Sequence, residues 1–229
     1  MKKYGYTQSN ADHSLFLKRQ NGKITVLIIY VDDMIVSGDD VDEITKLKTC
    51  LSNEFDMKNL GGLKYFLGIE VIRSKQGIFL CQRKYVLDLL KEAGMLGCQP
   101  MDPLIEQNHN LEELPDQVPT NKARYQRLVG RLIYLSHTPP NIAYAVSVVS
   151  RFMHNPSEVH MNEAIRIMRY LKSAPGRGPM FSKNHHTKIM GYCDSDWGAK
   201  GERRRSTTGY FTFIGGNLVT WKSKKQKVV

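Results

Sequence analysis

The sequence predicts an α+β fold of short β-hairpins, a helical region and a further antiparallel sheet. Three observations support this prediction. Short β-branched runs flank turn residues near residue 32 and near residue 75. Residues 122–173 repeat apolar side chains with helical spacing. Beyond residue 188, three apolar runs of strand length are separated by turn residues.

The first predicted hairpin surrounds two adjacent carboxylates, Asp32 and Asp33. Residues 24–29, apart from Thr25, and residues 34–36 are apolar and too short for helices, so they predict two strands joined by a tight turn at Asp32-Asp33. Two like charges at such a tip repel each other unless a cation or solvent neutralises them. Magnesium takes one or two carboxylates plus substrate phosphates. We interpret the hairpin as a metal site for phosphoryl transfer, with a solvated acidic turn as the alternative.

After this hairpin, Asp39 or Asp40 is predicted to cap a helix, and Gly61-Gly62 then breaks the chain. Residues 65–72 and 78–81 predict a second hairpin around the turn at 74–77. A helix is expected over residues 83–93, with Gly94 as its C-cap. The side chains expected to face inward from the two helices are Ile44, Leu47, Leu51, Phe55, Val86, Leu89 and Leu90.

The middle of the chain predicts a linker and then three helices. Four prolines among polar residues mark the linker at 97–121. Pro139-Pro140 ends the first helix, and Ser157 opens the third. We interpret the Met and aromatic positions here as core. The inward positions of the first and third helices are Tyr125, Leu128, Val129, Leu132, Leu135, Met161, Ala164, Ile165, Met168 and Leu171.

The last part predicts a three-stranded meander over 189–193, 210–214 and 218–221, with a turn at 215–217. Asp194 ends the first strand, and Asp196 lies on the same face if the extended conformation persists. Taken alone, this pair fits an acidic strand end. A run of arginines, Arg203, Arg204 and Arg205, is expected to bind phosphate, with a solvated charge run as the alternative.

The composition suits a protein with a polyanionic partner. The 229 residues carry a net charge of +11, of which residues 183–229 contribute +7. Nucleic acid is the obvious partner, and a solvated basic surface is the alternative. The four cysteines are isolated, which indicates reduced thiols and no zinc site. No signal peptide or membrane-spanning run is legible, so we expect an intracellular protein without a membrane partner, in an unknown compartment.

Several blocks of sequence follow one another in a characteristic order along the whole chain: residues 12–16, 30–33, 55–61, 65–71, 124–130, 142–146, 169–172, 191–197, 204–210 and 221–226. In that order and spacing they resemble the reverse transcriptase–ribonuclease H region of copia-type retrotransposon polyproteins. The resemblance implies RNA-directed DNA synthesis with Mg²⁺ or Mn²⁺. The implied partners are an RNA/DNA template-primer and the rest of the polyprotein.

The resemblance also implies domains and residue roles. Residues 1–95 would form part of the polymerase palm, 96–180 a linker and a helical thumb or connection region, and 181–229 the first strands of a ribonuclease H-like sheet. Asp32 and Asp33 would be catalytic metal ligands, and Asp194 the first metal ligand of ribonuclease H. The residues expected to touch nucleic acid are Tyr30, Val31, Phe66, Leu67, Gly68 and the three arginines at 203–205.

Both implied metal sites need further carboxylates that the resemblance places outside this chain. We therefore expect a fragment that is inactive alone and binds metal weakly or not at all. Departures from the family pattern, including Thr138 before Pro139, favour a decayed or truncated copy. Two alternatives stay open, a non-enzymatic basic nucleic-acid-binding remnant and an inert remnant without a stable fold.

Overall fold

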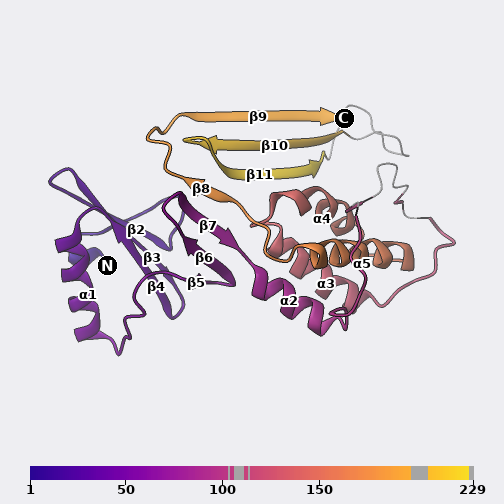
Figure 1. Ribbon diagram of the computed structural model, residues 1–229, viewed down its shortest axis with the longest axis horizontal. Coiled ribbons are helices and arrows are strands. Elements are labelled where there is room, and N and C mark those ends of the chain that lie inside the picture. The colour runs from indigo at the N-terminus through magenta and orange to yellow at the C-terminus, as the bar shows by residue number, and fades with distance from the viewer. Residues whose placement is uncertain (103, 106–110, 113, 197–205, 227–229) are drawn as a thin grey trace. The chain divides into compact units, whose positions relative to one another are not determined.

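The computed structural model describes residues 1–102, 104–105, 111–112, 114–196 and 206–226. The chain divides into two compact units, Met1–Leu63 and Lys64–Val229. Both combine helices with antiparallel sheets (Figure 1), which confirms the α+β class. The palm, thumb and ribonuclease H assignments and the domain bounds 1–95, 96–180 and 181–229 stay predictions. None of the helices in the described ranges has the length and hydrophobicity needed to cross a membrane.

The N-terminal unit is a four-stranded sheet in the order β1-β2-β3-β4, with α1 against one face. Alternate residues of β3 are buried, Thr25 and Leu27 among them, and Leu27 packs with Leu47 and Leu51 of α1. Asp40 caps α1 by accepting a hydrogen bond from the Glu43 amide at 3.1 Å, as expected. The elements are a 3₁₀ turn (Lys2–Tyr4), β1 (Thr7–Gln8), β2 (Leu15–Gln20), β3 (Lys23–Tyr30), β4 (Asp33–Gly38) and α1 (Val41–Glu54).

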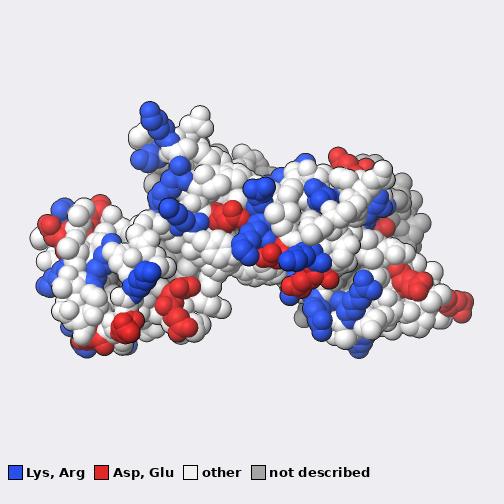
Figure 2. Space-filling view, turned by 60° about the horizontal axis from the view of Figure 1, so that its bottom comes forward, with Lys and Arg blue, Asp and Glu red and all other residues white. Residues whose placement is uncertain are grey.

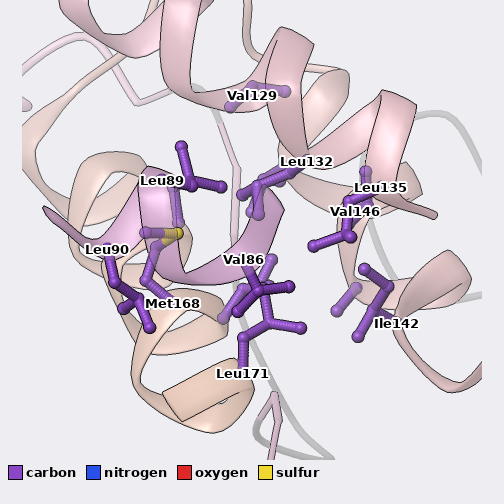
Figure 3. Close-up of a cluster of buried hydrophobic side chains, with 14 of the residues drawn as sticks. Val86, Leu89, Leu90, Val129, Leu132, Leu135, Ile142, Val146, Met168 and Leu171 are labelled. Atoms are coloured by element: carbon purple, nitrogen blue, oxygen red, sulfur yellow. The ribbon is translucent and has the colours of Figure 1, made fainter. Parts of the chain in front are cut away.

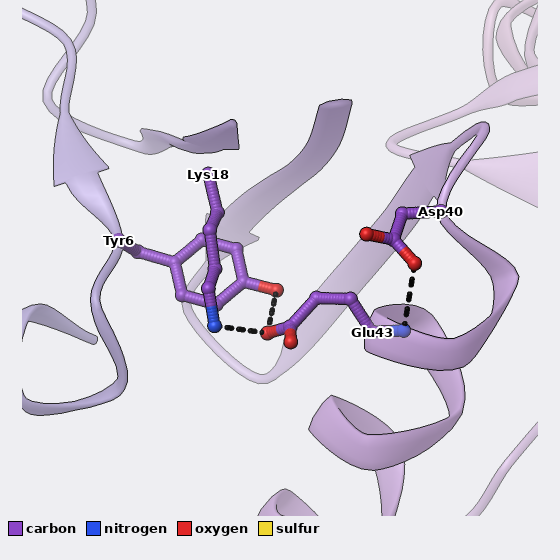
Figure 4. A network of polar contacts seen from close by, with 4 residues as sticks. All are labelled: Tyr6, Lys18, Asp40 and Glu43. Atoms are coloured by element: carbon purple, nitrogen blue, oxygen red, sulfur yellow. Dashed lines mark hydrogen bonds and ion pairs between the residues drawn. The ribbon is translucent and has the colours of Figure 1, made fainter. Parts of the chain in front are cut away.

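A buried polar network ties this helix to the sheet (Figure 4). Glu43 of α1 accepts hydrogen bonds from the Tyr6 hydroxyl at 3.1 Å and the Lys18 ammonium at 2.8 Å. Burial, together with the neighbouring Glu43 carboxylate, raises the pKa of Tyr6. We assign this network a structural role, because it lies beside the core of the unit and its members form hydrogen bonds with one another.

The C-terminal unit begins with a second sheet, in the order β5-β6-β7-β8. The single strand predicted over 65–72 is interrupted, because Leu67 and Gly68 adopt φ values of 47° and 78° and form a two-residue turn. The last strand of this sheet was not predicted, since its three residues gain their pairing from β7, far away in sequence. The strands are β5 (Tyr65–Phe66), β6 (Ile69–Arg73), β7 (Gly77–Cys81) and β8 (Met180–Ser182).

The helices of this unit share one apolar core (Figure 3). Most of the predicted inward positions of both units are buried, but Ile44, Leu128 and Ile165 are only partly so. The prediction for Phe55 was wrong: it is 53 % exposed, because it follows the end of α1 in an extended conformation. Ile167 is buried instead, and His160 is also buried, stacked on Phe152 and bonded to the Ser157 cap. The helices are α2 (Arg83–Glu92), α3 (Lys122–Leu135), a 3₁₀ turn (Pro140–Ile142), α4 (Ala143–Ser150) and α5 (Glu158–Ser173).

The predicted meander is present as a third sheet, in the order β11-β10-β9. Its strands, β9 (Ile189–Asp196), β10 (Thr207–Ile214) and β11 (Asn217–Lys225), are longer than predicted. Gly215 and Gly216 form the turn between the last two, both with positive φ. The Trp221 indole nitrogen donates to the Ser136 carbonyl at 2.9 Å, which ties the sheet to the end of α3.

Candidate metal-binding hairpin

The acidic hairpin turns one residue earlier than the sequence suggested. Tyr30 of β3 pairs with Asp33 of β4, and Ile29 pairs with Met34. The loop is therefore Val31-Asp32, and Asp33 already belongs to β4. The apolar residues set this register, because it places Leu27 opposite Val36 and Ile28 opposite Ile35. The prediction of a turn at Asp32-Asp33 was wrong by one position.

Val31 has a backbone conformation that β-branched residues rarely adopt. Its φ is 50°, whereas Asp32 is not among the residues with positive φ, so only the first loop position has a positive φ. Glycine is the residue preferred there, because a branched Cβ crowds the backbone. The Val31 side chain is 80 % exposed, so no burial compensates for this strain. Strain of this kind clusters at functional sites and supports a functional reading of the hairpin.

The register also places the carboxylates. Met34 and Val36 of β4 pack on the core that α1 covers, so Asp33 points to the opposite face of the sheet, as its partner Tyr30 does. Asp32 lies in the turn itself. Both aspartates are exposed, and neither carboxylate forms a hydrogen bond or ion pair with a described residue. Two adjacent carboxylates with free oxygens suit a hard divalent cation.

Two other aspartates of this unit, Asp12 and Asp39, accept hydrogen bonds within the fold. Asp12 accepts hydrogen bonds from the amide and hydroxyl of Ser14, and these bonds lower the pKa of Asp12. Asp39 accepts from the Ile24 amide at 2.6 Å. Across the described ranges, no group of three or more His, Cys, Asp or Glu side chains could hold a metal ion. The hairpin therefore presents a pair of carboxylates.

Phe66, Leu67 and Gly68, also predicted to contact nucleic acid, lie at a turn that a hydrogen bond from α3 holds in place. The Tyr134 hydroxyl of α3 donates to the Leu67 carbonyl, and Gly68 lies against the Tyr134 ring. Tyr85 of α2 packs edge-on against Tyr134, with 5.3 Å between the ring centroids. Sequence reasoning missed Tyr134, because nothing local links it to a turn far upstream in the chain.

The predicted ribonuclease H ligand, Asp194, lies exposed on β9 opposite Gly209. Its carboxylate accepts from the Ser195 amide at 2.9 Å. It shares a face with an aromatic cluster of Tyr192, Phe211 and Phe213. Asp196 ends the strand, but its side chain and the predicted phosphate contacts Arg203, Arg204 and Arg205 lie outside the described residues.

The surface charge is mixed. Figure 2 shows one face, on which Lys and Arg side chains form several groups with Asp and Glu between them. The net charge of +11 does not make this face uniformly basic.

Residues 1–106 match the sequence model of a family described as reverse transcriptase (RNA-dependent DNA polymerase). The chain is 36 % identical over 225 residues to the retrovirus-related Pol polyprotein from transposon RE1 of Arabidopsis thaliana, covering 98 % of this chain and 15 % of the relative. It is 35 % identical to the corresponding polyprotein from transposon TNT 1-94 of Nicotiana tabacum, covering 100 % of the chain and 18 % of the relative.

The chain matches a larger share of a shorter relative. The uncharacterized mitochondrial protein AtMg00810 of Arabidopsis thaliana is 37 % identical over 203 residues, which are 89 % of this chain and 84 % of that protein. The chain thus spans less than a fifth of the two polyproteins named above and most of this shorter protein. No solved structure gives a significant match.

Proposed function

The chain belongs to the reverse transcriptase family of copia-type retrotransposon Pol polyproteins, and we propose that it presents Asp32 and Asp33 as metal ligands for RNA-directed DNA synthesis. The observation that carries this proposal is the strained turn at Val31. A β-branched residue with φ of 50° at an exposed tip lowers the stability of the fold. Such strain is found most often where a functional site requires it. The turn places two carboxylates without described partners, one in the loop and one at the start of β4, at the end of a short hairpin.

The two carboxylates differ in their placement, and this suggests different roles. Asp32 extends from the loop and would hold the ion that activates the primer 3′-hydroxyl. Asp33 is fixed by its pairing with Tyr30 and would serve as a second ligand or a support. When bound, Mg²⁺ or Mn²⁺ stabilises the charge that develops on the attacking and leaving oxygens. These oxygen donors fit such hard cations.

Tyr30 and Val31 are proposed to lie against the primer terminus, since both are exposed next to the carboxylates. Phe66, Leu67 and Gly68 are proposed to position the primer 3′ end. The hydrogen bond from Tyr134 to Leu67 supports this role, because it fixes the turn on which these residues lie. The implied partners are the RNA/DNA template-primer and the rest of the polyprotein.

The ribonuclease H assignment is a separate proposal. Asp194 on the first strand of an antiparallel meander supports it, and Asp194 would be one ligand of a second metal site. The phosphate-binding role of Arg203, Arg204 and Arg205 depends on sequence alone.

We also propose that the isolated chain does not synthesise DNA. Two carboxylates bind a pair of divalent ions less tightly than three do, since ligand charge and number set affinity. The alternative, a non-enzymatic nucleic-acid-binding protein, differs in one respect. It binds nucleic acid equally well with and without a divalent cation.

The function is tested by binding of a labelled RNA–DNA template-primer, with and without Mn²⁺. Asp32→Asn is compared with Asp42→Asn, which removes an equal charge from the exposed first turn of α1. We expect Mn²⁺ to tighten binding by the unaltered and Asp42→Asn proteins and not by Asp32→Asn. Equal Mn²⁺ dependence in all three would overturn the proposed role of the hairpin.

A further inference from the structure

On the third sheet, Lys222 and Lys224 lie on one face and Asp194 lies on the other. Because directly paired residues point to the same side, Lys222 shares a face with Tyr210 and Cys193. Lys224 lies on this face too, opposite Thr208. We call this surface the lysine face. Its members by register are Ile189, Gly191, Cys193, Ser195, Thr208, Tyr210, Thr212, Ile214, Asn217, Thr220, Lys222 and Lys224.

No Asp or Glu belongs to the lysine face among the described residues of the three strands. The acid of β9 with a described side chain, Asp194, lies on the opposite face with Tyr192 and Phe211. Lys222 and Lys224 are exposed, and neither ammonium group pairs with any residue that the structure describes. Both positive charges are therefore available to an external anion.

The neighbours of the two lysines add neutral contacts. Thr212 and Thr220 share a hydrogen bond of 2.6 Å across the strands, which places two hydroxyls beside Lys222. Tyr210, directly opposite Lys222, exposes 42 % of its surface. Hydroxyls donate to phosphate oxygens, and exposed aromatic rings stack on unpaired bases.

The spacing suits a chain of anions. Residues two apart in a strand lie about 6.7 Å apart along it, so Lys222 and Lys224 can meet successive groups of an extended polyanion. We propose that the lysine face binds a single-stranded nucleic acid, with the lysines on phosphates and Tyr210 stacked on a base. This inference goes beyond the hairpin and shares with the proposed function only the class of partner.

The test measures binding of a labelled single-stranded DNA oligonucleotide to the full chain in EDTA, over a series of salt concentrations. EDTA removes any contribution of metal ions at the hairpin, so a failure here does not bear on the role of Asp32. Lys222→Gln/Lys224→Gln is compared with Lys183→Gln/Lys188→Gln, which removes the same charge from exposed positions outside the lysine face.

We expect the Lys222/Lys224 variant to bind roughly tenfold more weakly at low salt, with its log–log salt slope reduced by about 1.4, the contribution of two phosphate contacts to a single strand. Tyr210→Ala should weaken binding and leave the slope unchanged. The Lys183/Lys188 variant should keep more of both the affinity and the slope.

Three results would overturn the inference. The first is an equal loss in the two lysine variants, which would indicate a general charge effect. The second is no measurable binding by the unaltered chain. The third is equal displacement of the oligonucleotide by polyglutamate, which would indicate a surface for any polyanion. Circular dichroism of each variant verifies that the sheet is retained.

Discussion

Val31 is the single residue on which the proposed function of the hairpin depends most. Its positive φ at the first loop position would suit glycine better, and the residue is 80 % exposed, so little burial offsets the strain. We predict that Val31→Gly raises the free energy of unfolding of the N-terminal unit by about 1 kcal/mol, because relief of strain exceeds the extra entropy of the unfolded chain. Urea unfolding measures this change.

Val41→Gly provides the matched control. Val41 is also exposed, at 69 %, but it begins α1 with helical geometry. There glycine should lower the free energy of unfolding by about 0.5 kcal/mol, since it has a poor helix propensity. If Val31→Gly were as destabilising as Val41→Gly, the claim of a strained turn would be wrong.

Single residues differ in how far their roles and contacts can be predicted from sequence. Asp32 and Asp33 could be proposed as a site from sequence, because two adjacent acids lie between two apolar strands. The position of the turn could not be predicted, because the pairing of Leu27 with Val36 and of Ile28 with Ile35 determines it. Tyr134 could not be predicted as the partner of Leu67, because this contact depends on how α3 packs.

At the scale of elements, α1 depends on its buried ion pair. Glu43 and Lys18 expose only 10 % and 18 % of their side chains. We predict that Glu43→Gln lowers the free energy of unfolding of the N-terminal unit by roughly 3 kcal/mol, because it leaves the Lys18 charge buried without its counter-ion. Urea unfolding again gives the measurement.

The exposed pair of Lys3 and Glu54 is the control for this prediction. Solvent screens this pair, so Glu54→Gln should change stability little. A similar loss of stability in Glu43→Gln and Glu54→Gln would contradict the prediction that the buried ion pair stabilises the unit more than the exposed one.

Elements with a complete local signal were predictable from sequence. Asp40 marked the start of α1, and helical periodicity identified α2, α3 and α5. Strand β8 has no such signal, because its three residues are stabilised by partners far away in sequence, the paired strand β7 and the Asn217 side chain of β11. Strand β2 did carry one that was overlooked, the Asn21-Gly22 turn that joins it to β3, with both φ values positive.

At the scale of the whole molecule, each unit buries a tyrosine, and this sets the response to alkaline pH. Burial raises the pKa of Tyr6 in one unit and of Tyr125 in the other above the usual value of 10.0. Unfolded tyrosines lose their protons near that value while the folded ones keep theirs. Stability from these groups is therefore fully present below pH 10.0 and is lost as the pH rises above it.

Urea midpoints at about pH 9 and about pH 11 test this dependence. We expect the midpoint to fall between the two values, and to fall less in Tyr6→Phe and Tyr125→Phe. If both variants lost as much stability as the unaltered protein, lysine titration would explain the effect instead.

The activity of the isolated chain is a second property of the whole molecule. We predict no nucleotide incorporation in a magnesium-dependent primer extension assay on an RNA template. Incorporation that disappears in Asp32→Asn would show instead that the chain supplies every ligand it needs.

The most direct test of the central claim is where a divalent cation binds. Mn²⁺ broadens the NMR signals of nearby nuclei, so a titration followed in amide spectra locates its site. We predict that the amide signals of Val31, Asp32 and Asp33 broaden first, and that Asp32→Asn abolishes this while Asp42→Asn does not. Broadening that begins elsewhere, or that persists unchanged in Asp32→Asn, would contradict the assignment of the hairpin as the metal site.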